Sequence, residues 1–418
     1  MQSKREEYLA KLAKKRLSPY IKVITGIRRC GKSYLLKTLY RDYLRSVGVD
    51  NRQIVSVELD DDRFEELRDK NALRSYIENK CSDDSLQYYV FIDEVQMAAG
   101  FEGAIISLNN HSNYDMYITG SNSEFLSRDI SSKFRDRGDE IRIHPLSYKE
   151  FYDVYQGDKR FALTDYLTFG GMPRLINESD AVEKMAYLVN LVENTYLADV
   201  VERNRVRLPE EMGALFDVLC STTGSLVNPS SLAGTLLSEK HVKIDGKTVF
   251  SYMEHFERAY LLETVKRFNI KGKSYLKSSF KCYPEDVGLR NARLNFRQLD
   301  QGFGIETVVY NELRRRGYRV DVGMIETRER NKEGKQVYKQ NEVDFVARLA
   351  SKEYYIQVMD KSPLGQHGAN EYDNLLKVPG SFKKIAVINE PFRAYTNSDG
   401  ILVVSLEELL LERDSLDW

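Results

Sequence analysis

The sequence lacks several features that would assign a protein to a class at once, and each absence argues against one kind of protein or site. No window of roughly 18 consecutive apolar residues occurs, so we expect no transmembrane helix. The first residues have no apolar run behind them, so we expect no signal peptide. The four cysteines form no C-x-x-C pair, which argues against a disulfide framework or a zinc site and favours a cytoplasmic location: Cys30, Cys81, Cys220 and Cys282.

An excess of charge of either sign is also absent. The net charge is −1, so any face that binds nucleic acid must be local. Hydrophobic residues make up 42% and charged residues 30% of the 418 residues, which is typical of soluble globular proteins. A chain of this length comprises roughly two to four domains.

The strongest motif that is present fits G-x-x-x-x-G-K-[ST], the phosphate-binding P-loop. A β-branched run at 21–25 predicts a buried strand before it, and apolar residues at helical spacing follow it. Glycines allow the tight turn, and the helix N-terminus faces the anion. We expect Lys32 to reach the β- and γ-phosphates of ATP and Ser33 to ligate Mg²⁺. The nucleotide-binding candidates are Gly26, Ile27, Arg28, Arg29, Cys30, Gly31, Lys32, Ser33 and Tyr34.

A second motif is a hydrophobic strand at 88–92 that ends in two acids, Asp93 and Glu94. This is the Walker B pattern. Asp93 is expected to bind Mg²⁺, directly or through water. Glu94 is expected to orient and deprotonate the attacking water. Other strands are predicted at 54–59, 116–119 and 141–146, so this region is expected to be α/β.

Together these stretches resemble the prokaryotic predicted AAA-type ATPases that carry a C-terminal domain of unknown function. The resemblance extends over nearly the whole chain, through Gly170-Gly171-Met172-Pro173 and Tyr283 to Arg290 and on to 342–345. It implies a polar sensor between the Walker B acid and the γ-phosphate, with Asn122 the first candidate and Ser121 the second. It also implies an arginine finger. Arg128, Arg135 and Arg137 are close in sequence, and the resemblance favours Arg137, although the family usually has glycine at the position of Asp136.

Beyond the ATPase region, 160–205 is helical by pattern and is interpreted as a lid or connector. Residues 208–285 look like a winged helix-turn-helix, with three helices and two wing strands. Basic residues gather on the wing and would neutralise DNA phosphates, although a protein-binding winged helix with a solvated basic wing fits equally well: Lys266, Arg267, Lys271, Lys273, Lys277 and Lys281.

The last part, from about 286, resembles the restriction-endonuclease-like fold, which holds Mg²⁺ with an acid on a helix, an Asp, and an Asp/Glu-x-Lys strand. Glu306 and Asp344 match the first two elements. In the third, Gln357 replaces the acid and Met359 replaces the lysine, while Glu342 and Lys361 lie nearby at the wrong spacing. We therefore expect weak Mg²⁺ binding and no nuclease chemistry.

The sequence thus predicts an α/β chain of four parts: an AAA-type ATPase (1–160), a helical connector (161–207), a winged helix (208–285) and a degenerate restriction-endonuclease-like domain (286–418). The primary hypothesis is a Mg²⁺-dependent ATPase that binds DNA or a protein. We expect it not to associate with a membrane, and a homo-oligomer is possible. The alternatives are an ATP-regulated nuclease and a nucleotide-gated switch or DNA-binding regulator with little turnover.

Overall fold

A computed structural model describes residues 3–120, 134, 136–297, 299, 301–330, 336–360, 372–380 and 382–418. The chain divides into two compact units. The N-terminal unit comprises Met1–Pro145 with Arg258–Tyr260, and the C-terminal unit comprises Leu146–Glu257 with Leu261–Trp418. No helix in the described ranges is long and apolar enough to cross a membrane.

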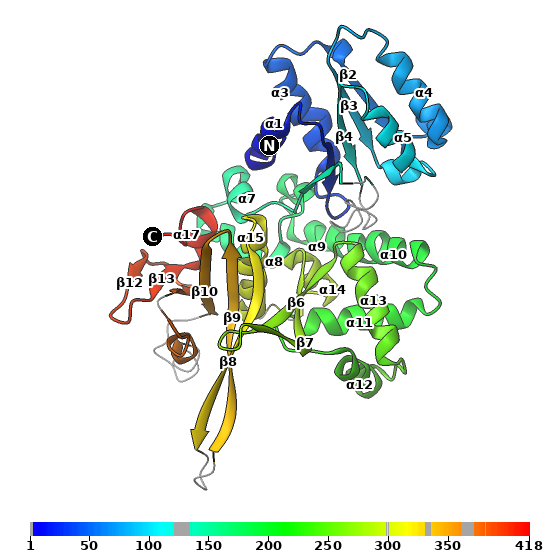
Figure 1. The fold of residues 1–418 in the computed structure, drawn as a ribbon. Coiled ribbons are helices and arrows are strands. Elements are labelled where there is room, and N and C mark those ends of the chain that lie inside the picture. The colour runs from blue at the N-terminus through cyan, green and yellow to red at the C-terminus, as the bar shows by residue number, and fades with distance from the viewer. Residues whose placement is uncertain are drawn as a thin grey trace. The chain divides into compact units, whose positions relative to one another are not determined.

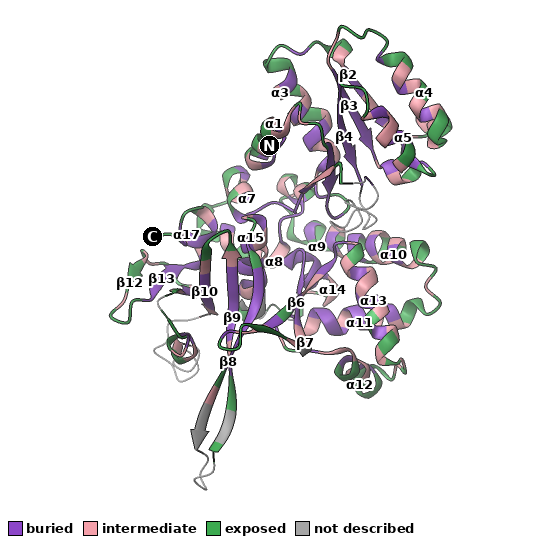
Figure 2. Cartoon of the chain, in the orientation of Figure 1, coloured by how far each residue is buried: buried purple, intermediate pink, exposed green. Residues whose placement is uncertain are grey.

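Among the described residues, the N-terminal unit is built on five parallel strands: β1 (Ile21–Thr25), β2 (Ile54–Glu58), β3 (Tyr88–Asp93), β4 (Tyr114–Thr119) and β5 (Gly138–Arg142). Their order in the sheet is β2-β3-β4-β1-β5. Every residue of β1, β3 and β4 is buried, as Figure 2 shows in purple. This pattern is the one expected of a parallel sheet covered on both faces.

Helices flank this sheet, with α1 and α3 on one side and α4 and α5 on the other (Figure 1). The helical elements of the unit are α1 (Glu6–Lys15), α2 (Lys32–Tyr34), η1 (Leu35–Tyr40), α3 (Arg41–Ser46), η2 (Asn51–Gln53), η3 (Asp62–Arg68), α4 (Lys70–Lys80), η4 (Val95–Met97) and α5 (Phe101–Leu108).

One predicted strand lies elsewhere than the sequence suggested. The last strand of this sheet was expected at 141–146, but β5 begins at Gly138 and ends at Arg142. Its register with β1 explains the shift, because Gly138 pairs with Ile21 and Arg142 with Thr25. The apolar residues at 141–146 therefore mostly follow the strand, and the length of β1 decides where pairing stops.

The described helical segments of the C-terminal unit are α7 (Tyr148–Val154), η6 (Lys159–Phe161), α8 (Ala162–Phe169), η7 (Pro173–Asn177), α9 (Ala181–Asn190), η8 (Leu191–Leu197), α10 (Ala198–Arg203), α11 (Pro209–Ser221), α12 (Pro229–Lys240), α13 (Gly246–Arg258), α14 (Val287–Arg293), α15 (Gln301–Arg315) and α17 (Leu406–Leu411). Asn228 caps α12 with a reciprocal capping box, and Pro229 occupies the first turn of this helix.

The strands of this unit form one mixed sheet: β6 (Leu262–Asn269), β7 (Ser274–Pro284), β8 (Arg319–Arg330), β9 (Gln336–Leu349), β10 (Lys352–Met359), β11 (Lys383–Ile388), β12 (Tyr395–Thr396) and β13 (Leu402–Ser405). Their order is β12-β13-β11-β10-β9-β8-β6-β7. The β8–β9 hairpin extends beyond its neighbours (Figure 1).

The eight-stranded sheet joins segments that the sequence assigned to different domains. The expected wing strands, β6 and β7, continue the sheet of the chain's last part through the parallel pairing of Arg267 with Val322. One core cluster likewise contains Leu146, Tyr148 and Phe151 together with Ile305 and Phe345. The segment after residue 145 is therefore part of the same hydrophobic core as the C-terminal sheet.

Two motifs that are far apart in sequence meet at Asp286. Its carboxylate accepts hydrogen bonds from the backbone N–H of Gly288 (2.9 Å) and Leu289 (3.2 Å), which caps α14, and from Gly171 N–H (2.7 Å). Burial raises the pKa of Asp286 to about 6, against the lowering effect of these hydrogen bonds. A Cβ at Gly170 would lie 2.0 Å from the Asp286 carboxylate, so the glycine permits this approach.

We expect Asp286→Ala to lower the free energy of unfolding by roughly 2–4 kcal/mol. The substitution removes a helix cap, worth about 0.5–2 kcal/mol, and leaves the buried Gly171 N–H without its acceptor, which costs about 1–3 kcal/mol. Chemical denaturation measures the difference. Asp180→Ala is the matched control, since Asp180 also caps a helix, α9, but its cap is exposed. Equal losses in both variants would contradict the role of Asp286 as a junction.

Candidate functional site

The glycine loop at 26–33 follows β1 and leads directly into α2, as the P-loop motif predicts. Gly26 has a φ of 136° and Gly31 a φ of 103°, values that other residues rarely adopt. A Cβ on Gly26 would lie 2.0 Å from the carbonyl oxygen of Ile143. Both glycines are thus required by the backbone, and the loop forms a cradle at the carboxyl end of β1.

Lys32 is buried and its ammonium lies inside this loop. Its Nζ donates to the carbonyl oxygens of Gly26 (2.9 Å) and Ile27 (3.2 Å). Around it, Ile27 and Cys30 are buried, Ser33 and Tyr34 are half-buried, and Arg28 and Arg29 are exposed. The structure therefore brings the nucleotide-binding candidates into one loop, with the lysine at its centre.

Arg5, which the sequence analysis did not single out, is hydrogen-bonded to the glycine loop. Arg5 is buried just before α1, and its guanidinium donates to the carbonyl oxygens of Cys30 and of His144, the latter at 2.9 Å. Tyr8 on α1 accepts a hydrogen bond from His144 N–H (3.2 Å). Helix α1 thus packs beside the P-loop, and only the tertiary structure shows that Arg5 links the two.

Asp93 lies at the carboxyl end of β3, where it meets the P-loop helix. Its carboxylate accepts hydrogen bonds from the hydroxyls of Ser33 and Thr119. Lys37 Nζ also donates to it and lies 2.7 Å away. Burial would raise the pKa of Asp93, but these donors together lower it, so the group is an ionised acceptor. The two residues predicted to hold Mg²⁺, Ser33 and Asp93, are therefore in contact.

Lys37 was not singled out in the sequence, although it follows Lys32 on the same helical segment. Its ammonium bridges Asp93 and Glu58, with Nζ 2.8 Å from a carboxylate oxygen of Glu58 at the end of β2. Hydrogen bonds and charge from both acids raise the pKa of Lys37, in spite of its partial burial. Burial raises the pKa of Asp60, and the negative charge of the nearby Asp93 raises it further.

Glu94 follows in a left-handed backbone conformation, with a φ of 51°. Its N–H donates to Thr119 Oγ1 (3.0 Å), and its carboxylate accepts a hydrogen bond from the Gln96 amide. These contacts fix Glu94 beside Asp93 at the carboxyl edge of the sheet. In open α/β sheets this edge is where ligands bind.

Of the remaining candidates, Asn122, Ser121, Arg128 and Arg135 lie outside the described residues, so the sensor prediction stays a prediction. Asp136 has a φ of 61°. This conformation explains why glycine usually stands there in the family that the sequence resembles, since glycine adopts it without strain.

Arg137 lies beside the start of β1, whereas the P-loop follows the end of that strand. Its carbonyl accepts a hydrogen bond from Ile21 N–H (2.8 Å), at the start of β1, and its guanidinium donates to Asn110 (2.7 Å). The five residues of β1 separate it from the loop by about 16 Å, at roughly 3.3 Å per residue. Arg137 therefore does not face its own loop, and a finger role requires a neighbouring copy.

If Arg137 completes the site of a neighbouring copy, Arg137→Ala should lose most ATP turnover and keep ATP binding, because its own loop is intact. Mixing it with Lys32→Ala should restore part of the turnover, since one complete interface can form. Phosphate release from the mixture measures this. Asn110→Ala is the matched control for the lost hydrogen bond. Absence of recovery on mixing would contradict action between copies.

The C-terminal unit contains a second cluster of charged residues, and it corrects the expectation that the nuclease-like site has lost its cation. Lys281 on β7 is buried, with Nζ 2.8 Å from Glu306, 2.7 Å from Glu342 and 3.6 Å from Asp344. The lysine comes from a different strand than the pattern requires, so sequence spacing could not reveal it. Gln357 joins the cluster by donating a hydrogen bond to Asp344 (2.6 Å).

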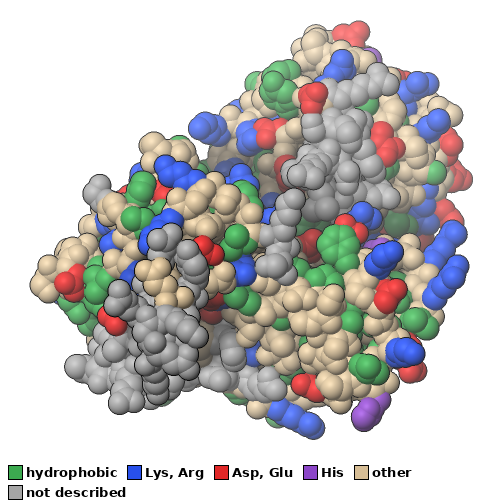
Figure 3. Space-filling view, turned by 60° about the horizontal axis from the view of Figure 1, so that its bottom comes forward, with side chains coloured by type: hydrophobic (Ala, Val, Ile, Leu, Met, Phe, Trp, Pro, Cys, Tyr) green, Lys and Arg blue, Asp and Glu red, His purple; other side chains and the backbone are tan. Residues whose placement is uncertain are grey.

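The basic wing is smaller than the sequence suggested. Lys281 is occupied in the acidic cluster, and Arg267 is buried and donates to Ser279 (2.9 Å) and Gln340 (2.8 Å). Lys266, Lys271 and Lys273 are exposed, whereas the side chain of Lys277 is outside the description. On the face drawn in Figure 3, Lys and Arg are interspersed with Asp and Glu.

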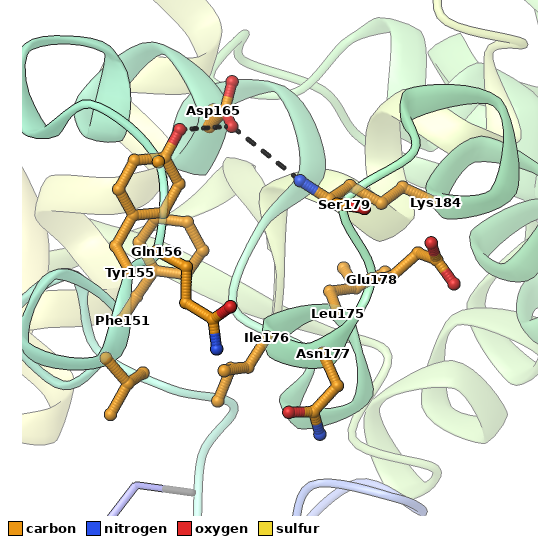
Figure 4. A pocket seen from close by; sticks show the side chains of 12 residues that line it. Phe151, Tyr155, Gln156, Asp165, Leu175, Ile176, Asn177, Glu178, Ser179 and Lys184 are labelled. Carbon is orange, nitrogen blue, oxygen red and sulfur yellow. Dashed lines mark hydrogen bonds and ion pairs between the residues drawn. The ribbon is translucent and has the colours of Figure 1, made fainter. Parts of the chain in front are cut away.

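A cavity of about 380 Å³ in the C-terminal unit lies between α7, α8 and α9 (Figure 4). Two of its charged groups are paired, because Asp165 accepts a hydrogen bond from Tyr155 (2.7 Å) and lies 3.8 Å from Lys184, and a third, Glu178, accepts a hydrogen bond from the backbone N–H of Asp180 (3.2 Å). Apolar side chains such as Phe151 and Ile176 complete the lining. The size suits a small molecule, but the paired charges point to no particular chemistry.

Two solved structures illustrate what the chain is similar to. AMPPCP-bound DnaA from Aquifex aeolicus matches with 16% identity and a TM-score of 0.31, over 60% of this chain and 86% of that chain. The ORC1 protein of Aeropyrum pernix, solved in complex with DNA, matches with 12% identity and a TM-score of 0.30, over 72% and 94%.

The sequence comparisons are more extensive. Residues 18–152 match an AAA domain, and residues 160–300 match a domain of unknown function (DUF8612). An uncharacterised protein of Haemophilus influenzae is 32% identical over 413 residues, which cover 98% of each chain. An uncharacterised protein of Methanocaldococcus jannaschii, MJ1544, is 29% identical over 314 residues, 71% of this chain and 67% of that one.

Proposed function

This chain belongs to the family of AAA-domain proteins that carry a C-terminal domain of unknown function, and on this basis we propose that it is a Mg²⁺-dependent ATPase. We further propose that its nucleotide state controls a C-terminal module that binds DNA or a protein. The AAA domain itself is established by the match over residues 18–152.

One observation carries the proposal: the P-loop lysine, the Ser33 hydroxyl and the Asp93 carboxylate converge at one edge of a parallel sheet. The residues fit a nucleotide with its metal ion. The glycine cradle leaves no room for a Cβ at Gly26, and a hydroxyl and an ionised carboxylate are ligands that Mg²⁺ prefers. When bound, Mg²⁺ supplies charge neutralisation on the phosphates.

The chain's own groups then have distinct tasks. Lys32 would leave the carbonyls of its loop to bind phosphate oxygens, and the loop N–H groups would hold the rest of the phosphate chain. Ser33 and Asp93 would hold the metal ion. Glu94, kept in place by Thr119 and Gln96, would orient a water molecule and take its proton.

Phosphate release from ATP by the purified full-length protein, with and without Mg²⁺, tests the proposal. We expect steady turnover that requires Mg²⁺. Tight ATP binding without turnover would instead support the alternative of a nucleotide-gated switch. A pull-down from native cells with Glu94→Gln, which should retain ATP, is expected to capture the module's DNA or protein partner.

The alternative of an ATP-regulated nuclease rests on the C-terminal cluster. Lys281 supplies a cation that the sequence pattern lacked, but Gln357 still stands where that pattern has an acid. With one carboxylate fewer, we expect no Mg²⁺-dependent DNA cleavage, and the winged-helix and restriction-endonuclease-like domains stay proposals. Cleavage that is lost in Asp344→Ala, at unchanged thermal stability, would favour the nuclease.

A further inference from the structure

Lys37 places a positive charge directly on the carboxylate that is proposed to hold the metal ion of the nucleotide. Its Nζ lies 2.7 Å from Asp93 Oδ2 and 2.8 Å from Glu58 Oε2. Asp93 is 4% exposed, so water solvates its charge poorly and nearby donors must stabilise it. Among the residues that the structure describes, Lys37 is the one cation that forms an ion pair with Asp93. Lys32 does not share this task, because its ammonium donates to loop carbonyls instead.

The other contacts of Asp93 show that both of its carboxylate oxygens already have a donor. Oδ1 accepts a hydrogen bond from the hydroxyl of Thr119, and Oδ2 accepts one from Lys37. The hydroxyl of Ser33 also donates to this carboxylate. A divalent ion that arrived without a nucleotide would have to displace one of these donors or share an oxygen with the ammonium. The repulsion between two neighbouring cations opposes such sharing.

The register of the sheet explains why a lysine is needed at this point. Glu58 and Asp93 are paired at the ends of β2 and β3, so two acids stand side by side on neighbouring strands. Like charges in this position destabilise a sheet. Lys37 reaches both acids from η1, a π-helical segment that continues the P-loop helix. Such wide turns are frequent at functional sites.

We infer that Lys37 is a positioning residue that holds Asp93 and serves as the resident cation of the nucleotide-free site, so that a divalent ion binds there with a nucleotide and not alone. The inference rests on the proposed function, because it assigns Asp93 to the metal ion of Mg·ATP. Without nucleotide, the ammonium offsets the charge of the two acids. With nucleotide, the phosphate oxygens supply the negative charge and the ligands that a second cation needs.

Titration of the nucleotide-free, full-length protein with Mn²⁺, followed by calorimetry, tests the inference. We expect weak binding to the wild type and an affinity that rises by roughly tenfold or more in Lys37→Met, since groups that contact metal ligands typically change metal affinity by about 10- to 100-fold. Lys37→Met combined with Asp93→Asn should lose this gain. A purely structural role predicts the opposite sign, because a misplaced Asp93 would bind the ion less well.

Two further variants separate the charge of Lys37 from its hydrogen bonds. Lys37→Arg keeps a cation beside Asp93 and should retain the weak Mn²⁺ binding of the wild type. Lys37→Gln keeps a hydrogen-bond donor without the charge, so it should gain affinity as Lys37→Met does. It also preserves the test if Lys37→Met does not fold. Lys14→Met removes an exposed lysine of α1 and is the control, with no change expected.

Titration of the same variants with Mg·ATP distinguishes this inference from the proposed function. The affinity of Lys37→Met for Mg·ATP should fall far less than that of Lys32→Ala, because the glycine loop is intact. A wild type that binds no Mg·ATP would refute the proposed function alone, since the Mn²⁺ titrations contain no nucleotide.

Three results would overturn the role of Lys37. The first is a Mn²⁺ affinity that is unchanged or lower in both Lys37→Met and Lys37→Gln. The second is a gain in affinity that persists when Asp93→Asn is added. The third is a loss of Mg·ATP binding in Lys37→Met as large as that in Lys32→Ala, since this would make Lys37 a phosphate contact.

Discussion

Replacing Lys32 with alanine is expected to weaken the binding of Mg·ATP by at least about a hundredfold. Lys32 is the buried cation of the glycine loop, and no second lysine lies in that loop. A hydrogen bond to a charged group contributes about 1.5–3 kcal/mol, and Lys32 is expected to make two, so roughly 3–6 kcal/mol is lost. Each 1.4 kcal/mol corresponds to about tenfold in affinity.

Calorimetric titration with Mg·ATP measures this loss. Lys14→Ala, which removes an exposed lysine from α1 in the same unit, is the control and should leave the affinity unchanged. Since Lys32 also holds the carbonyls of Gly26 and Ile27, thermal unfolding should be recorded in parallel. Unchanged affinity in a folded Lys32→Ala protein would refute the assignment of this loop as a phosphate site.

The second large effect concerns turnover. Glu94→Gln should bind ATP with nearly the affinity of the wild type and hydrolyse it slower by roughly 100- to 10,000-fold, the usual contribution of a general base. The amide keeps the side-chain volume and a contact with Gln96, while Asp93 still holds the metal ion. Glutamine, however, does not accept the proton of the attacking water.

Single-turnover and steady-state phosphate release, compared with the ATP affinity, separate the two effects. Glu66→Gln, an exposed residue of the same unit, is the matched control. A parallel fall in affinity and turnover would mean that Glu94 acts on binding. Full activity in Glu94→Gln would show that another residue is the general base. Asp60, which is close to Asp93 and Glu94, would be the next residue to test.

Much of the N-terminal unit was determined by the sequence itself. The glycine loop, Lys32, Ser33, Asp93 and Glu94 were all predicted from local motifs, and their contacts agree with the predicted grouping. Local patterns suffice here because parallel strands all present their carboxyl ends at one edge, so short motifs that end strands are brought together by the topology. The glycines of the loop likewise reflect a backbone requirement of the loop itself.

Tertiary structure alone decided the rest, because the deciding contacts join residues that no periodicity relates. Arg5 reaches Cys30 and His144, and Lys281 reaches acids that lie 25 or more residues away. The sequence position of Arg137 does not reveal its distance from the P-loop. The register of β5 places Arg137 beside the start of β1, whereas the P-loop follows the end of β1. Long-range pairing of strands fixed these distances, and strand pairing depends on the packing of the whole unit rather than on any local pattern.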